Sequence, residues 1–295
     1  MRRVTVALVV AVVSACSAPV ADESVSITRP GAASTTTESI PTTTPQSTTT
    51  STMATTTTTA GPFARPEWLG TRPLPLRLDG HGVAAPTPDE LVNRRLETID
   101  ILDPPGGDRY VATIEPIPDD VLARSSWVED CPVGVEELRY LTMTHLGFDG
   151  KMHTGEMIVN AAVAEDVVSV FEKLFEAGFP IEQMRVVRRD EIDDPPTGDW
   201  NETTSFVCRP AVGSTSWSYH AYGLAIDVNP FHNPYLKGDL VIPELASTYT
   251  DRSEMRPGMI VAGDVVTEAF VAIGWEWGGN WNTLKDWMHF SSTGR

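Results

Sequence analysis

The sequence predicts an α+β domain with a mostly antiparallel sheet and flanking helices, and two observations carry this prediction. Asp149 and Gly150 lie between two runs rich in β-forming residues, 135–148 and 151–161, which predicts an antiparallel hairpin closed by a two-residue turn. Residues 164–177 then place apolar side chains at helical spacing and are followed by a glycine. A hairpin, a helix and further short strands in succession are typical of α+β domains.

The remaining elements are expected to be short. They are the strands 184–188, 205–209, 225–228 and 287–290, and a helix at 265–273. Alternation within 225–228 places Ile226 and Val228 on one face and Asp227 on the other. In the last strand, Phe290 takes one face and His289 the opposite face. We therefore expect Asp227 and His289 to face away from the apolar sides of their strands.

The first residues of the chain are typical of an export signal. Two arginines precede an apolar run, residues 4–13, which is about half the ~20 residues that a membrane-spanning helix needs. Residues 13–16 read Val-Ser-Ala-Cys and resemble the lipobox of bacterial lipoproteins. Residues 1–16 are thus expected to form a lipoprotein signal, with Cys16 as the lipid-bearing membrane anchor at the extracytoplasmic face of the bacterial envelope. Ordinary signal cleavage a few residues later is the alternative.

Composition divides the rest of the chain into three segments. Residues 17–62 are mostly Thr, Ser, Pro and Ala, and they have too few apolar side chains to offset the entropy of ordering, which predicts a disordered tether. Residues 63–124 are proline-rich but contain large apolar side chains such as Trp68, and we expect an ordered arm there. Residues 125–295 hold the predicted hairpin, helices and later strands and form the expected globular body.

Charge and cysteine content exclude one class of partner and indicate a crosslink. The chain has 40 acidic and 22 basic residues and a net charge of −18, so nucleic acid is not an expected partner. If Cys16 carries lipid, Cys131 and Cys208 remain as a pair in an oxidising compartment, which favours a disulfide. Two buried free thiols are the alternative.

Two motifs carry the candidate chemistry, "SYHAYGLAID" at residues 218–227 and "DWMH" at residues 286–289. Gly223 can take a positive φ between His220 and Asp227 and so fold the chain back, although such a pair alone is more often hydrogen-bonded than metal-binding. His289 supplies a third ligand, and two histidines with one carboxylate are the ligand set of a catalytic zinc site that leaves a position for water. Asp286 is then the unligated carboxylate that can move a proton.

The two motifs resemble those of a known family. The first fits the Ser-x-His-x-x-Gly-x-Ala-x-Asp signature of the D-alanyl-D-alanine carboxypeptidase family of zinc peptidases, the VanY-like group, and the second fits its Asp/Glu-x-x-His partner. This resemblance implies Zn²⁺ on His220, Asp227 and His289, with Asp286 as general base. It also implies that Arg209, in "FVCRP", binds substrate and steadies the oxyanion.

The resemblance covers roughly residues 125–295 and implies fold and substrate as well as ligands. The implied fold is the small α+β fold shared with the Hedgehog signalling domain, and the implied substrates are stem peptides of peptidoglycan. The expected activity is that of an extracytoplasmic D-alanyl-D-alanine carboxypeptidase. An L-alanyl-D-glutamate endopeptidase of the same family, or a non-catalytic zinc-containing wall-binding protein, are the alternatives.

Other polar residues are expected to have structural roles. Ser218, His220 and Asp227 also suggest a serine hydrolase, but the chain has no Gly-x-Ser-x-Gly elbow. His153 and Glu156 are three apart on an expected strand and so face opposite sides, which disfavours a joint metal site. The remaining histidines are expected to be surface or loop residues: His81, His145 and His232.

Overall fold

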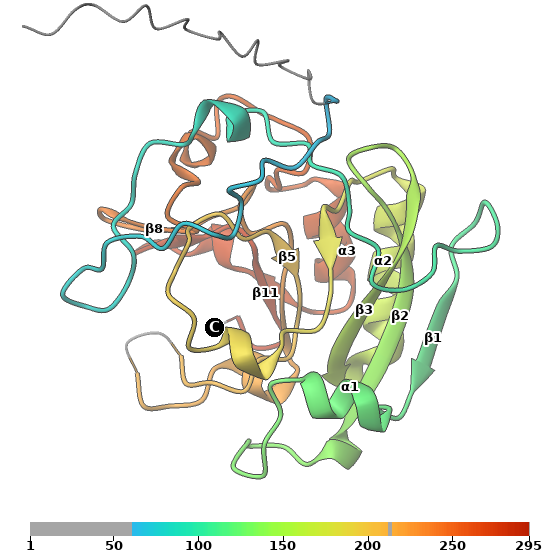
Figure 1. The fold of residues 1–295 in the computed structure, drawn as a ribbon. Helices are drawn as coiled ribbons and strands as arrows, with labels where there is room; N and C mark the ends of the chain where they lie inside the picture. Colours follow the sequence, from blue (N-terminus) through green and yellow to red (C-terminus); the bar gives the residue numbers. More distant parts are fainter. Residues whose placement is uncertain (1–60, 212–213, 295) are drawn as a thin grey trace, which may run out of the picture. The chain divides into compact units, whose positions relative to one another are not determined.

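The computed structural model describes residues 61–211 and 214–294 and confirms the α+β class (Figure 1). Within these residues, three α-helices accompany several small antiparallel sheets and one pair of parallel strands. The predicted signal and lipobox at residues 1–16, and nearly all of the predicted tether, lie outside the described residues. No helix in the described part of the chain has the length and apolar character needed to cross a bilayer.

The first sheet contains the predicted hairpin. Its strands are antiparallel, in the order β1 (Ala112–Glu115), β2 (Leu138–Leu146) and β3 (Met152–Asn160). The hairpin closes with a three-residue loop, not the expected two-residue turn, because the Gly147 amide pairs with the Lys151 carbonyl. Phe148 is thereby drawn inward, where its ring stacks on His232 at 4.7 Å, and Gly150 takes the left-handed conformation that ends the loop.

Two helices and this sheet share the main apolar core. Helix α2 (Ala164–Glu176), which was predicted over residues 164–177, lies against β2 and buries Val167, Phe171 and Leu174 (Figure 1). Helix α3 (Val265–Ala272) packs against α2 and is capped by Asp264, whose carboxylate accepts a hydrogen bond from the Thr267 amide. A short helix, α1 (Asp119–Arg124), precedes the hairpin. The core continues beneath the strands that carry the two sequence motifs.

Short strands build the rest of the body. Two further antiparallel sheets have the orders β6-β11-β9 and β10-β7-β8, and β4 pairs with β5 in parallel. Their bounds are β4 (Gln183–Met184), β5 (Glu202–Thr203), β6 (Ala225–Asp227), β7 (Tyr235–Lys237), β8 (Leu240–Ile242), β9 (Glu276–Trp277), β10 (Lys285–Asp286) and β11 (His289–Ser291). The strand expected at 184–188 is therefore reduced to its first residue and the one before it.

Residues 205–209, expected as a strand, belong to no strand of the described structure. Their backbone amides donate to separate segments instead of to one partner strand. The Phe206 amide donates to the Ile158 carbonyl at 3.1 Å, whereas the Cys208 amide donates to the Ser126 hydroxyl oxygen at 3.1 Å. The segment therefore links the hairpin sheet to the first motif without joining a ladder.

The predicted arm contacts the body through a buried ion pair. The Arg94 side chain is only 1% exposed, and its guanidinium donates to both carboxylate oxygens of Glu182 at 2.7 Å and to the Asp199 carbonyl at 2.6 Å. Its guanidinium also lies 4.4 Å from the centre of the Phe231 ring. Strand β1, although within the predicted arm, pairs with β2. The division at residue 125 stays a prediction.

Replacing Arg94 with alanine is expected to lower the free energy of unfolding by about 3–5 kcal/mol, because the buried Glu182 would lose its two-bond partner and keep only the more exposed Arg65, at 3.2 Å, as a cation. Denaturant titration of the variant measures this loss. The matched control is Arg77→Ala, which removes an exposed pair with Asp239 and should leave the stability close to that of the wild type. Equal losses in the two variants would contradict a structural role for the buried pair.

His145 is buried on a strand, so the expectation that it is a surface or loop residue is wrong, whereas His232 lies in a loop as expected but is buried there. His145 is on β2 opposite His153, and neither of its ring nitrogens has a hydrogen-bond partner among the described residues. His232 is fully buried between Phe148 and the ring of Tyr249. Burial lowers the pKa of His145 to about 3 and that of His232 to about 4.

Because of these two buried histidines, we expect the free energy of unfolding to decrease in mild acid. The unfolded chain binds a proton at each below pH 6.5, while the folded chain does not until about pH 3 or 4, so stability is present above pH 6.5 and lost as pH falls. Each should contribute about 1.4 kcal/mol per pH unit in this window. Denaturation between pH 4 and pH 7 should therefore show a shallower slope in His145→Leu, and an unchanged slope would contradict the assignment.

Candidate metal centre

A tight turn presents His220. The residue lies in the 3-10 helix Tyr219–Tyr222, whose first amides are capped by Ser218, with the Ser218 hydroxyl oxygen accepting from the His220 amide at 3.3 Å. The helix ends at Gly223, with φ 65°, where a Cβ would lie 2.5 Å from the Asn160 amide nitrogen. Glycine is required by both its conformation and its surroundings. This Ser218 contact gives the serine an orienting role instead of that of a nucleophile.

Strand register brings Asp227 and His289 together. They are directly opposite on the antiparallel strands β6 and β11, and their neighbours Ile226 and Phe290 are opposite each other and fully buried in the core. Because side chains alternate along a strand, burial of these apolar neighbours turns the aspartate and histidine to the other face. At the edge of β6 opposite to β11, the backbone of Asp227 forms two hydrogen bonds with that of Thr204, of 2.9 and 3.1 Å.

The three predicted ligands converge. The His220 Nε2 atom lies 3.3 Å from His289 Nδ1 and 3.4 Å from Asp227 Oδ1. The distance between His289 Nδ1 and Asp227 Oδ1 is 3.1 Å. In a tetrahedral zinc site with bonds of about 2.0–2.1 Å, ligand atoms lie roughly 3.3 Å from one another. Two imidazole nitrogens and one carboxylate oxygen at this spacing fit a zinc ion, and they form the one such group of three found among the described residues.

Hydrogen bonding and charge prepare these side chains for a cation. The His220 Nδ1 atom donates to the Ser205 carbonyl at 2.7 Å, which leaves the lone pair of Nε2 available to a metal ion. Burial alone would raise the pKa of the Asp227 carboxyl, but the imidazoles of His220 and His289 hold it well below its usual range. The carboxyl is therefore a carboxylate, the form that binds a metal. The Ser205 carbonyl carries no sequence signal because every residue has one.

Asp286 lies beside the three ligands without belonging to their group. It is on β10, and its Oδ1 atom is buried with no hydrogen-bond partner in the described structure. Burial raises the pKa of Asp286 to about 7, His289 and Arg209 oppose the rise, and the negative Asp227 adds to it. A carboxyl whose pKa lies near neutrality can both accept and return a proton.

Arg209 and two of the ligands, His220 and Asp227, line one cavity of about 610 Å³. The hydrogen bond of its guanidinium in the described structure, at 3.2 Å, goes to the neighbouring Pro210 carbonyl, so most of its donors are free of described partners. The lining of the cavity also includes Leu69 and Thr71 of the predicted arm and Trp200. Sequence motifs did not indicate these wall residues, because they lie far from both motifs along the chain.

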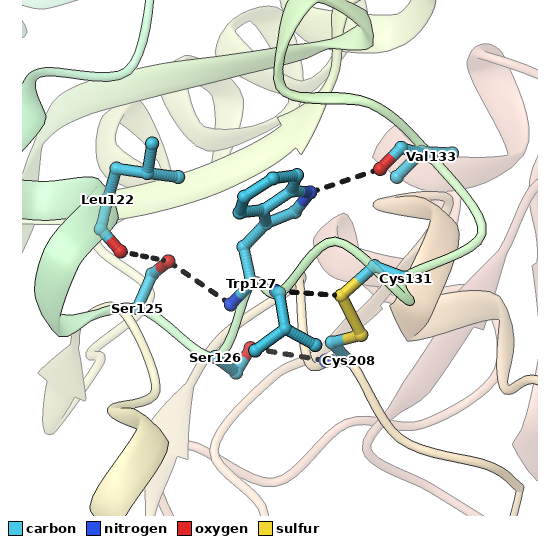
Figure 2. Close-up of a disulfide and its surroundings, with 8 residues drawn as sticks. Leu122, Ser125, Ser126, Trp127, Cys131, Val133 and Cys208 are labelled. Carbon is cyan, nitrogen blue, oxygen red and sulfur yellow. Dashed lines mark hydrogen bonds between the residues drawn. A yellow bond between two sulfur atoms is a disulfide. The ribbon is translucent and has the colours of Figure 1, made fainter.

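The other candidate residues have separate partners. Glu156 accepts hydrogen bonds from Arg124 and from the Tyr140 hydroxyl, while His153 lies between Asp100 and Asp149. They do not form a second three-ligand group in the described residues. The predicted disulfide between Cys131 and Cys208 is confirmed, directly before Arg209 (Figure 2).

This arrangement defines a class of site: two histidines and one carboxylate at zinc spacing, with a second carboxylate nearby, as in mononuclear zinc hydrolases. Residues 212–292 match the family model of D-alanyl-D-alanine carboxypeptidase, so the resemblance predicted from the two motifs is confirmed for this segment, and the match supports a peptidase. The segment holds all three ligands and Asp286 but is less than a third of the 295-residue chain. Comparisons with curated proteins and with solved structures found no match.

Proposed function

We propose that the protein is an extracytoplasmic zinc peptidase that removes the terminal D-alanine from peptidoglycan stem peptides. The observation that carries this proposal is the tetrahedral spacing of His220, Asp227 and His289, which would hold the ion. Bound zinc supplies a water of pKa about 7 and polarises a carbonyl group. The family match over residues 212–292 supports peptide as the substrate and the bacterial cell wall as its source.

Two further side chains have roles in this proposal. Asp286, with its buried and unpartnered Oδ1, accepts the proton of the attacking water and returns it to the leaving amine. Arg209 lines the cavity and can present guanidinium donors to it. Its guanidinium pairs with the developing oxyanion or with a carboxylate of the stem peptide.

Location and architecture complete the proposal. Residues 1–16 would direct export and leave Cys16 as a lipid anchor, and residues 17–62 would act as the tether that lets the body reach the wall. The peptidase domain at 125–295 would adopt the fold shared with the Hedgehog signalling domain, with the arm at 63–124 in contact with it through the Arg94–Glu182 pair. The cavity wall from the arm supports a role for residues outside the family match.

The test is digestion of purified muropeptides with pentapeptide stems by the zinc-loaded protein, with products read by mass spectrometry. Loss of one terminal D-alanine is expected. Cleavage between L-alanine and D-glutamate would instead assign the endopeptidase activity. No product from any stem peptide, despite bound zinc, would reject the enzyme and favour a wall-binding protein.

A further inference from the structure

Arg209 lines the candidate active-site cavity but lies outside the regular strands. The segment 205–209 joins no strand, so a ladder of backbone hydrogen bonds does not fix it. The Arg209 amide donates to the carbonyl of Val207, only two residues away, and the Arg209 carbonyl accepts from the Ser218 amide at 3.2 Å. On its C-terminal side Arg209 is held by the pairing of Pro210 with Trp217, whereas on its N-terminal side its position depends on the residue before it.

That residue, Cys208, is fixed to a distant loop by two links (Figure 2). Its sulfur forms the disulfide with Cys131, and its amide donates to the Ser126 hydroxyl oxygen at 3.1 Å. Cys208 is only 5% exposed and packs in the apolar cluster that contains Phe206 and Val186. Both links end in the loop between α1 and β2, which is outside the segment that carries the metal ligands.

The loop that contains Ser126 and Cys131 is stabilised by hydrogen bonds of its own. The Trp127 indole donates to the Val133 carbonyl at 3.0 Å (Figure 2). The Cys131 amide donates to the Val128 carbonyl at 2.9 Å. Where this loop begins, Arg124, the last residue of helix α1, donates two hydrogen bonds to the Glu156 carboxylate on β3. The disulfide thus ties Arg209 to the hairpin sheet through a braced loop.

The metal ligands have positioning contacts other than the disulfide, although the Val207 amide also donates to the His220 carbonyl at 3.2 Å. His220 is oriented by the Ser205 carbonyl, Asp227 by its two backbone bonds with Thr204, and His289 by its place on β11. Opening the disulfide should therefore release Arg209 while these contacts persist.

We infer that Cys131, Cys208 and Ser126 are positioning residues for Arg209, and that the disulfide-bonded form is the fully active one. This inference rests on the proposed function, because Arg209 acts only if a substrate enters the cavity. It assigns the crosslink a part in substrate turnover beyond its contribution to stability. It also predicts that reduction lowers activity without removing the metal.

The test is a double-mutant cycle on the full chain, combining Cys131→Ala/Cys208→Ala with Arg209→Ala. With Arg209 present, loss of the disulfide should lower kcat/KM roughly 10- to 100-fold, as small displacements of a binding group do. In the Arg209→Ala background the same change should cost less than about threefold, because the group being positioned is absent. Zinc content, measured by elemental analysis, should equal that of the wild type in all variants.

Ser126→Ala is the second variant and guards against poor folding of the cysteine pair. It keeps the disulfide and removes only the acceptor of the Cys208 amide. Its loss of kcat/KM should be smaller than that of the cysteine variant and should likewise disappear in the Arg209→Ala background. Circular dichroism confirms folding of each variant.

Equal losses with and without Arg209, or loss of zinc along with activity, would overturn the positioning role and leave the disulfide as a structural crosslink. Full activity of both the cysteine and the Ser126 variants would overturn it as well. Failure of the proposed function has a different signature, because the wild-type protein with bound zinc would then cleave no stem peptide.

Discussion

Replacing His220 with alanine is expected to abolish zinc binding and peptide cleavage together. The change removes one of three ligand atoms and leaves Asp227 and His289 as an incomplete pair. Because bound metal contributes several kcal/mol to stabilising the transition state, turnover should fall by more than about 1,000-fold. Elemental analysis of the purified variant and digestion of pentapeptide muropeptides measure the two effects.

The matched control is His81→Ala, which removes a histidine from the predicted arm, outside the three-ligand group. This variant should keep wild-type zinc content and turnover. Circular dichroism would confirm that His220→Ala is folded, since its core neighbours are unchanged. Retention of a full complement of zinc by a folded His220→Ala variant would show that the ion lies elsewhere.

The ligand set could be foreseen because each of its members carries a local signal. Alternation put Asp227 and His289 on the face opposite Ile226 and Phe290, and the structure has these apolar residues buried in the core. Alternation does not show with which other strand each of these strands pairs. The direct pairing of β6 with β11 joins residues 62 apart in the chain, and sequence periodicity contains no information on such a pairing.

The position of His145 in the sequence indicated that it is buried, but the prediction did not use this information. His145 is two residues from Met143 and four from Leu141 on β2, so the period of a strand places all three on one face. All three are buried. Its class as a polar residue led to a surface prediction, whereas its register indicated the core.

Contacts made by the backbone and by distant segments could not be foreseen. The strand expected at 205–209 has suitable residues, but its amides are taken by unrelated groups, among them the Ser126 hydroxyl. The Ser205 carbonyl that orients His220 and the Arg94–Glu182 pair depend on tertiary folding alone. The sequence therefore predicts the side chains of the site better than it predicts what holds them.

Replacing Asp286 with asparagine is expected to stop cleavage while zinc binding persists. Asparagine is similar in size but cannot accept a proton as a base, so turnover should fall about 10²- to 10⁴-fold. The three ligands are untouched, and zinc content should equal that of the wild type. This pattern separates Asp286 from His220, whose replacement should remove both properties. Full turnover by Asp286→Asn would show that another group moves the proton.

The pH dependence of cleavage gives a second test of the same residue. Burial raises the pKa of Asp286 to about 7 without a cation, and a bound divalent cation favours the carboxylate and so lowers this value. As a base Asp286 must be deprotonated, so kcat/KM should fall as pH decreases through a midpoint at or below about 7. The residual activity of Asp286→Asn should lack this decrease. Were both proteins to lose activity with the same midpoint, the titrating group would be one other than Asp286.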